Sequence, residues 1–321
     1  MSPALRVPTT ANAPAITVVI PTRDRGDSIL LPIRTLIEND YDRFEVRIVD
    51  QSESNATATS VAPFLVDPRV RYARTRSTGL SAALNEGIRA VTTEFVAVTG
   101  DDCVVQADWL AGLLAGFSTD ARTGVIFGNI VPGPHDPAAG FVQGSLLKTP
   151  VLVRSVSGKY RLAGTSACMA LRKTVWEALN GFDEMLGVGA PLQAGEDTDF
   201  VIRALLAGYF VHDTPQATVV HHGIVPWDQR RGLIQRNWYG TGAAFAKALK
   251  RGGPQMFAAL MRLAWYWVSR PSPVAASLGD RPYRAATLAA FTRGFAAGFV
   301  IPVDCISGHF RSSGAPSPRT R

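Results

Sequence analysis

The stretch EFVAVTGDD, residues 94–102, decides the fold because it places an apolar, strand-like run directly before two adjacent carboxylates, Asp101 and Asp102. In open α/β sheets, ligands bind beyond the carboxyl ends of the strands, so this acidic pair is expected to face a ligand crevice. Neighbouring like charges are costly unless water or a cation compensates them, and Mg2+ and Mn2+ prefer oxygen ligands. The stretch therefore indicates either a divalent-metal site or a plain acidic turn.

Strands alternate with helices around this stretch. Apolar, β-branched runs predict strands at 16–20 (stopped by Pro21), 46–49 and 70–73, and helical patterns cover 27–39, 55–65 and 81–91. This alternation predicts an α/β fold with a parallel sheet wound by right-handed crossovers. Because no Gly-x-Gly-x-x-Gly follows the first strand, a dinucleotide-binding fold of the Rossmann kind is disfavoured.

The pattern is weaker in the second half of the chain. Residues 112–160 are rich in Gly and Pro and are predicted to form loops and short strands over the site. A second patterned region spans 164–208, and an apolar run at 217–220 follows it. Two apolar segments, 254–269 and 285–303, predict helices packed on the body or lying at a membrane surface, since Arg293 interrupts the longer one.

Charge is distributed unevenly along the 321 residues. The formal net charge is +7, and ten basic residues against two acidic ones lie from Lys250 onward. The body is therefore nearly neutral, which argues against nucleic-acid binding and indicates a basic C-terminal appendage. The first fifteen residues lack a signal-peptide pattern, and the three cysteines lack zinc-ligand spacing. We therefore expect reduced thiols, no nucleic-acid partner and a cytoplasmic protein, with peripheral contact to the inner face of the cell membrane.

Further polar residues follow the predicted strands. Asp50 ends the second strand at the same sheet edge as the acidic pair, where it either accepts hydrogen bonds from an imide or a ribose or caps an Asp-Gln-Ser turn. The polar loop PTRDR, residues 21–25, follows the first strand and is suited to wrap a nucleotide.

A second acidic cluster, GEDTD at 195–199, opens a predicted helix. Acids in a first turn stabilise the helix dipole, but three of them exceed what capping needs, so one is a candidate general base. The pair His221-His222 ends an apolar strand, and because neighbouring strand residues face opposite ways, only His221 is expected to reach the site as a metal ligand.

Taken together, these residues resemble a family 2 glycosyltransferase with the nucleotide-diphospho-sugar transferase fold called GT-A. The resemblance covers roughly residues 16–245 and rests on the order and spacing of eight short motifs. In chain order these motifs are VVIPTR at 18–23, VDQS at 49–52, GLSAALNEGI at 79–88, TGDDC at 99–103 with DWL at 108–110, ALRK at 170–173, GFDE at 181–184, GEDTDF at 195–200, and HH at 221–222.

The resemblance implies a single, mostly parallel nucleotide-binding sheet flanked by helices over residues 15–249. It leaves a flexible tail at 1–14, a basic, aromatic-rich helical extension at 250–310 and a disordered tail at 311–321. It also implies an inverting, metal-dependent enzyme that transfers a hexose from a nucleoside-diphosphate sugar by in-line displacement. The expected pathway is the synthesis of a cell-surface polysaccharide or glycolipid.

The same resemblance assigns roles to individual residues. Asp102 takes the place of the last Asp of the DXD signature and binds Mg2+ or Mn2+ together with Asp101 and His221. Asp197 matches the base that deprotonates the acceptor hydroxyl, with Glu196 and Asp199 beside it on the acceptor side. The donor-binding residues are those at the sheet edge and on the helix after the third strand: Pro21, Thr22, Arg23, Asp24, Asp50, Asn85 and Asp101.

Some positions depart from the family pattern. Gly100 stands where many relatives have an Asp, Arg23 and Asp24 replace a more usual Tyr-Asn, and Gln51 replaces a frequent second Asp. UDP- and dTDP-sugars are the expected donors because Asp50 suits a pyrimidine imide. The expected acceptor is a saccharide or a lipid-linked saccharide at an anionic membrane surface contacted by residues 250–310.

Two other functions stay open at this point. One is a degenerate, sugar-nucleotide-binding scaffold subunit, which Gly100 favours and the two acidic clusters disfavour. The other is a nucleotidyltransferase that forms a sugar nucleotide, although Arg23 and Arg25 lack the glycine-rich loop of that class.

Overall fold

The computed structural model describes residues 13–252, 254–269 and 281–311. The tails predicted at 1–14 and 311–321 therefore fall almost wholly outside the described residues. Eleven strands are described: β1 (Ile16–Thr22), β2 (Phe44–Asp50), β3 (Val70–Arg74), β4 (Phe95–Thr99), β5 (Cys103–Val105), β6 (Thr123–Pro132), β7 (Gly140–Val142), β8 (Val151–Val153), β9 (Cys168–Arg172), β10 (Phe210–His221) and β11 (Ile224–Pro226).

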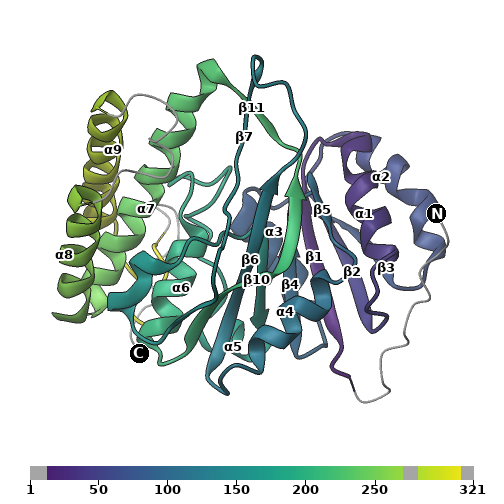
Figure 1. The fold of residues 1–321 in the computed structure, drawn as a ribbon, viewed down its shortest axis with the longest axis horizontal. Coiled ribbons are helices and arrows are strands. Elements are labelled where there is room, and N and C mark those ends of the chain that lie inside the picture. Colours follow the sequence, from purple (N-terminus) through teal and green to yellow (C-terminus); the bar gives the residue numbers. More distant parts are fainter. Residues whose placement is uncertain (1–12, 253, 270–280, 312–321) are drawn as a thin grey trace, which may run out of the picture.

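The described α-helices are α1 (Leu30–Ile37), α2 (Ala56–Val61), α3 (Leu80–Arg89), α4 (Trp109–Phe117), α5 (Lys173–Ala178), α6 (Glu196–Leu206), α7 (Arg230–Gly252), α8 (Pro254–Ser269) and α9 (Arg281–Val300). Four short 3-10 helices join them: η1 (Gly26–Ile29), η2 (Ala62–Val66), η3 (Val156–Arg161) and η4 (Trp227–Gln229). The strands and helices predicted for the first hundred residues are all present, with ends shifted by a few residues. The fold is the predicted α/β arrangement with a C-terminal helical layer (Figure 1).

The central sheet has the strand order β3-β2-β1-β4-β9-β6-β10-β5, with β8 paired to β10 off this path. Pairing from β3 to β4 is parallel, as predicted, whereas β9 lies antiparallel between β4 and β6. The sheet is therefore parallel in its N-terminal half and mixed beyond β4. A small second sheet of β7 and β11 stands above the carboxyl ends of the strands (Figure 1).

Strand β1 runs two residues further than the sequence predicts, through Pro21 to Thr22. Proline is tolerated in a strand only where no ladder partner needs its missing N–H. Here β4 stops pairing with β1 at Val19, while pairing with β2 continues to Thr22 opposite Asp50. The extra residues carry the polar loop after β1 to the end of β2.

The prediction of loops and short strands over 112–160 is wrong for α4 and β6. Strand β6 is a ten-residue strand in the middle of the sheet, and its first six residues are buried. Its glycines mark close packing, because a Cβ atom at Gly128 would lie 2.4 Å from the carbonyl oxygen of Ala217 on β10. The glycines therefore permit a central strand where composition indicates a loop.

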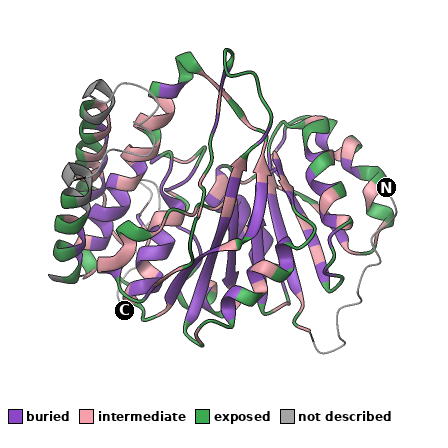
Figure 2. Ribbon diagram, in the orientation of Figure 1, coloured by how far each residue is buried: buried purple, intermediate pink, exposed green. Residues whose placement is uncertain are grey.

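Apolar clusters fill both faces of the sheet (Figure 2). Helices α1, α2 and α4 cover one face, and α3, α5 and α6 cover the other. Beyond α6, the helices α7, α8 and α9 form a further layer at the edge of the molecule (Figure 1). Helix α7 is continuous across the domain boundary predicted at residues 249 and 250. Among the described residues, no helix is long and apolar enough to cross a membrane.

Candidate active site

Parallel pairing gathers the predicted polar residues at one edge of the sheet. Thr22 at the end of β1 lies in register with Asp50 at the end of β2, and β4 ends at Thr99, two residues before Asp101. The backbone N–H of Asp24 donates to the Ser52 hydroxyl at 2.7 Å, which ties the loop after β1 to the turn after β2. The expected crevice edge is therefore formed by the carboxyl ends of β1, β2 and β4.

Arg25 bridges the acidic pair. Its Nε lies 3.2 Å from Asp101 Oδ1, and one of its terminal nitrogens lies 3.2 Å from Asp102 Oδ2. Burial raises the pKa of Asp101, and the charge of Arg25 opposes that rise. A half-exposed guanidinium thus supplies the positive charge that two neighbouring carboxylates require. The sequence names Arg25 only as part of the loop 21–25, because its reach across to β4 depends on the fold.

Gly100 makes room for the side chain of Asp102. A Cβ atom at this position would lie 2.9 Å from Asp102 Oδ1 and 3.2 Å from the sulfur of Cys103. An aspartate at residue 100 would therefore need a different placement of the Asp102 side chain. The glycine at position 100, which departs from the family pattern, therefore suits the local packing of the acidic pair.

His221 faces Asp102 from strand β10. Antiparallel pairing sets His221 opposite Cys103 on β5, and His221 Nε2 lies 3.4 Å from Asp102 Oδ1. Its Nδ1 donates to the backbone carbonyl of Gln143 at 2.9 Å, which fixes the ring and presents Nε2 to the carboxylate. Although burial opposes it, Asp102 raises the pKa of His221 above its ordinary value. Metal-binding histidines are commonly oriented in this way.

An opening between Asp102 and His221 fits a divalent cation. A Cβ atom at Gly223 would lie 2.7 Å from both Asp102 Oδ2 and His221 Nε2, so the glycine keeps the space between these two atoms clear. The carboxylate oxygen suits Mn2+ or Mg2+, and the imidazole nitrogen suits Mn2+ better than Mg2+. Cys103 also lies within this cluster, but burial strongly raises the pKa of its thiol, which therefore keeps its proton near Asp102.

Asp50 is fully buried at the end of β2. Its Oδ1 accepts hydrogen bonds from the backbone N–H and the hydroxyl of Ser52, and its Oδ2 accepts one from the Tyr72 hydroxyl at 2.6 Å. The turn-capping role considered from the sequence is therefore present. Since each carboxylate oxygen can accept two hydrogen bonds, Oδ2 retains the capacity for one more donor.

The acidic start of α6 is joined to the same edge. Ser166 lies just before β9, whose first residue Cys168 pairs with Thr99 at the end of β4. The Ser166 hydroxyl donates to Glu196 Oε1 at 3.0 Å. Burial and the neighbouring charge of Asp197 raise the pKa of Glu196 to about 7, while Asp197 itself is half-buried. Glu196 and Asp197 thus differ in environment although they are adjacent.

Asp199, predicted on the acceptor side, lies in a buried charge network. Arg203 Nε contacts Asp199 Oδ2 at 2.8 Å, and Lys247 Nζ contacts Asp199 Oδ1 at 2.7 Å and also binds Asp183. Against the cost of burial, Arg203 and Lys247 hold the pKa of Asp199 below its ordinary value. The network joins α6 to α7, and both oxygens of Asp199 serve that packing contact.

Asn85, predicted to bind the donor, is saturated by protein groups. Its amide nitrogen donates to the carbonyl of Phe182 and to Glu184, and its oxygen accepts from Trp176 and from the N–H of Phe182. An amide side chain has two donor hydrogens and two acceptor lone pairs, so these four bonds use its full capacity. The structure supports a role for Asn85 in anchoring the turn at Phe182 rather than in holding a ligand.

Sequence comparison identifies the family. The profile of glycosyl transferase family 2 matches residues 17–178, which include β1 to β4, the acidic pair and β9. The chain belongs to glycosyl transferase family 2. The acidic pair lies within the part of the chain that the profile matches, whereas the start of α6 lies beyond it. The GT-A fold predicted from the motifs is confirmed by the similarity to solved structures.

Curated proteins similar to this family 2 glycosyltransferase are named for three different products. It is 26% identical over 267 residues to the pre-mycofactocin glycosyltransferase of Mycobacterium tuberculosis, covering 79% of this chain and 52% of that protein. It is 25% identical over 218 residues to the succinoglycan biosynthesis protein ExoO of Rhizobium meliloti, covering 67% and 62%. The O-antigen biosynthesis protein RfbC of Myxococcus xanthus is 25% identical over 226 residues, covering 65% and 17%. The chain thus spans from 17% to 62% of the length of these relatives.

Solved structures share the fold. The mannosyltransferase PcManGT of Pyrobaculum calidifontis, in complex with GDP-Man and Mn2+, superposes with a TM-score of 0.62 at 21% identity, covering 92% of this chain and 89% of that one. Residues 1–349 of TarS from S. aureus, in complex with UDP-GlcNAc, superpose with a TM-score of 0.59 at 14% identity, covering 88% and 81%. Both similarities concern the fold.

Proposed function

We propose that this family 2 glycosyltransferase is an inverting, metal-dependent enzyme. It transfers a hexose from a nucleoside-diphosphate sugar to a hydroxyl of a saccharide or a lipid-linked saccharide. The observation that carries this proposal is the opening between Asp102 and His221, which Gly223 keeps clear at the sheet edge. In open α/β sheets that edge is where ligands bind.

The nucleoside of the donor is assigned to the ends of β1 and β2. Pro21, Thr22, Arg23 and Asp24 surround it, and the remaining acceptor position of Asp50 Oδ2 accepts its imide N–H. Uracil and thymine each offer one such N–H, which supports a UDP- or dTDP-sugar. The buried position of Asp50 strengthens this contact, since little water competes for it.

The donor diphosphate is assigned to the acidic pair. Asp102 and His221 would hold Mg2+ or Mn2+, with Asp101 beside them, and the bound ion would act as a Lewis acid that stabilises the departing nucleoside diphosphate. Arg25 then leaves the carboxylates it bridges in the absence of the ion. Its guanidinium, suited to bidentate contact with phosphate, becomes available to the diphosphate on the same edge.

The acceptor is assigned to the start of α6. Asp197 accepts the proton of the acceptor hydroxyl while that oxygen attacks the anomeric carbon opposite the leaving diphosphate, so the configuration at this carbon inverts. Glu196, whose pKa is raised to about 7, exchanges its proton near neutral pH and can donate a hydrogen bond in its protonated form. Two adjacent carboxyl groups in different environments can thus take different roles.

The C-terminal helices are assigned to a membrane surface. Exposed apolar side chains lie on α8 and α9, at Phe257, Met261, Trp265, Leu288, Phe299 and Val300. Figure 2 shows that the described outer faces of these helices are exposed. Exposed apolar groups beside basic residues are typical of helices that lie on an anionic bilayer. This arrangement supports peripheral binding near a lipid-linked acceptor.

A product assay tests the catalytic proposal. UDP- and dTDP-sugars are incubated with simple glycoside acceptors in Mn2+ or in EDTA, and NMR reports the anomeric configuration of the product. We expect an inverted anomer, formed only with the metal. Asp197→Asn should lower turnover by about 10^2- to 10^4-fold while nucleotide binding is retained. A retained configuration, or full turnover by this variant, would contradict the assignment of Asp197 as base.

A further inference from the structure

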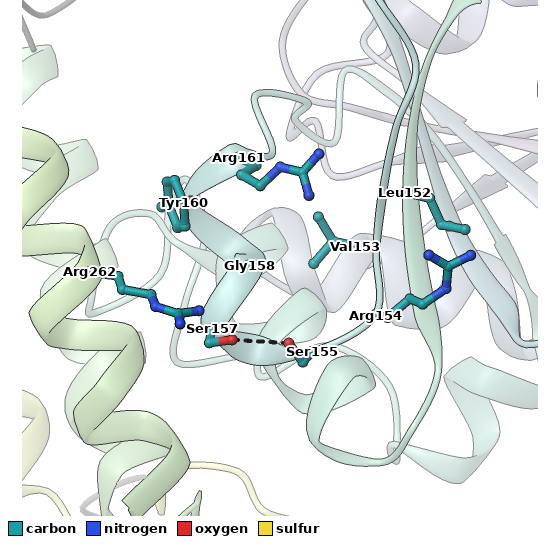
Figure 3. Close-up of a pocket in the computed structure, with 9 residues that line it drawn as sticks. All are labelled: Leu152, Val153, Arg154, Ser155, Ser157, Gly158, Tyr160, Arg161 and Arg262. Atoms are coloured by element: carbon teal, nitrogen blue, oxygen red, sulfur yellow. Dashed lines mark hydrogen bonds between the residues drawn. The ribbon is translucent and has the colours of Figure 1, made fainter.

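A basic pocket lies between η3, the end of β8 and helix α8, and no part of the mechanism above uses it. It has a volume of about 280 Å3, and Arg154, Arg161 and Arg262 line it together with Ser155 and Ser157. Figure 3 shows Arg262 reaching from α8 toward η3, while Arg154 and Arg161 come from β8–η3 residues. The pocket therefore joins the transferase fold to the C-terminal helical layer.

The charge of this pocket is not compensated within the described chain. None of the nine described residues that line it is acidic. Arg161 and Arg262 form no ion pair with any described residue, and Arg154 rests over the ring of Phe210 at 5.5 Å. The three arginines are exposed, so solvent screens part of the repulsion between their guanidinium groups, and an anion bound in the pocket would lower it further.

The chemistry of the lining selects the class of anion. Guanidinium groups bind phosphate and carboxylate oxygens through paired N–H donors. The hydroxyls of Ser155 and Ser157 hydrogen-bond each other at 3.0 Å, so this pair can add one further donor. A carboxylate would neutralise one of the three positive charges, whereas a diphosphate or two phosphate groups would neutralise most of them. We propose that this pocket is a second oxyanion site that binds the phosphate or diphosphate group of the acceptor.

The position of the pocket connects it to the proposed reaction, on which this part of the inference rests. Lys159 lies on the same 3-10 helix as Arg161, and its charge interacts with those of Asp197 and Asp213. Helix η3 thus lines the pocket, and its Lys159 lies near Asp197, the proposed base. On the other side, α8 carries both Arg262 and the exposed Phe257 and Met261. An acceptor held by its phosphate at α8 would extend along η3 toward Asp197.

Binding of inorganic pyrophosphate to the full chain tests the site. Titrations are followed by calorimetry in EDTA, and the variant Arg161→Gln/Arg262→Gln is compared with wild type. The matched control is Arg71→Gln/Arg89→Gln, which removes two exposed arginines from β3 and α3. We expect the pocket variant to bind pyrophosphate at least about tenfold more weakly and the control to bind it as wild type does.

Two further measurements separate the outcomes. Thermal stabilisation by UDP with Mn2+ should be the same in all three proteins, which shows that a loss of pyrophosphate binding does not come from the donor site. Sedimentation with vesicles of phosphatidylglycerol and phosphatidylcholine identifies the source of the phosphate. Loss of vesicle binding in the pocket variant indicates a lipid headgroup, and unchanged vesicle binding indicates a free or saccharide-linked phosphate.

Equal pyrophosphate affinity in the pocket variant and the control would overturn the oxyanion site. That result would leave the proposed transferase function standing, because sugar transfer is measured separately. Conversely, failure to detect transfer would not affect the pyrophosphate titration.

Discussion

Two pairs of acidic residues in this protein differ in what neutralises them. Asp101 and Asp102 lie at the sheet edge, where a half-exposed Arg25 and the ring of His221 contact them. Asp183 and Asp199 lie in the interior, where Lys247, as buried as they are, contacts both. The first pair meets a charge that can move away into solvent, and the second meets one that cannot.

This difference separates a site from a structural contact. At the interior pair, Arg203 and the backbone N–H of Phe310 supply further hydrogen bonds, so the carboxylates are satisfied by the protein itself. At the edge pair, Gly100 and Gly223 leave space around Asp102, and the contacting arginine is half-exposed, so we propose that a cation can replace it. A count of acidic residues does not make this distinction, whereas the identity and burial of their partners does.

The largest expected effect comes from removing the interior cation. Lys247→Met should lower the free energy of unfolding by roughly 3–5 kcal/mol, because two buried carboxylates lose their shared positive partner. Urea denaturation measures the change. Lys148→Met, at an exposed position, should change stability by less than about 0.5 kcal/mol. If Lys247→Met had the unfolding free energy of wild type, the interior pair would contribute no more to stability than the edge pair does.

The edge pair should respond in the opposite way. Asp102→Asn is expected to weaken Mn2+ binding by at least about 100-fold, since it removes a charged oxygen ligand, and to lower the unfolding free energy much less than Lys247→Met does. Calorimetric titration with Mn2+ measures the affinity. Asp183→Asn is the matched variant. It should be less stable than wild type, but its folded molecules should bind Mn2+ with the affinity of wild type. If both variants lost Mn2+ affinity equally, the two pairs would not be functionally distinct.

Glu196 combines features of both pairs, because it is buried and forms no ion pair with any residue that the structure describes. Its folded-state pKa of about 7 lies above the ordinary 4.5, so the folded protein binds more protons than the unfolded one between these pH values. Stability should therefore fall as pH rises from about 4.5 to 7, by about 1–3 kcal/mol. Glu196→Gln should remove most of this slope, and the exposed control Glu53→Gln should keep it.

Asp213 contributes a smaller slope of the same sign, since burial raises its pKa to about 6, and this part remains in both variants. Equilibrium denaturation at a series of pH values supplies the measurement. An unchanged slope in Glu196→Gln would show that Glu196 is ionised throughout this range.

The smallest expected effect concerns Arg25. If its guanidinium holds the place of a cation, Arg25→Gln should bind Mn2+ roughly three- to tenfold more tightly than wild type, because the competing charge is gone. Arg23→Gln is the matched control, since the side chain of Arg23 contacts its neighbour Asp24 at 3.5 Å, and only its backbone contacts the acidic pair. Equal Mn2+ affinity in the two variants would show that Arg25 does not compete with Mn2+ for the acidic pair.

The fold was predictable where local pattern and tertiary pairing agree. Strands β1 to β4 and helices α1 to α3 have the expected periodicity, and parallel pairing follows from their alternation. Strand β6 was not predictable, because its glycines resemble loop composition and are explained only by the approach of β10. The antiparallel insertion of β9 between β4 and β6 likewise depends on long-range pairing.

The sequence predicted which residue types gather at the candidate site better than it predicted the role of each residue. His221 facing Asp102 follows from strand alternation, and the joint edge of Asp50 and the acidic pair follows from parallel order. Asp199 and Asn85 lie in motifs of the family, as their neighbours do. In the structure, however, Lys247 uses the carboxylate of Asp199, and the backbone of Phe182 uses the amide of Asn85. Lys247 lies in an alanine-rich helix, and its local sequence does not predict its two carboxylate partners, which are 48 and 64 residues away.

The sequence by itself determined which chemical groups this protein has and which sheet edge carries them, because strand period and chain order set both. Only the tertiary structure decided which carboxylates are already neutralised by the protein and which stay open to a ligand. The physical reason is that the energy of a charge depends on its distance to partners and on burial, and both are set by segments far apart in the chain. Asp102 and Asp199 are the same residue type in similar motifs, and their neighbours in space give them different roles.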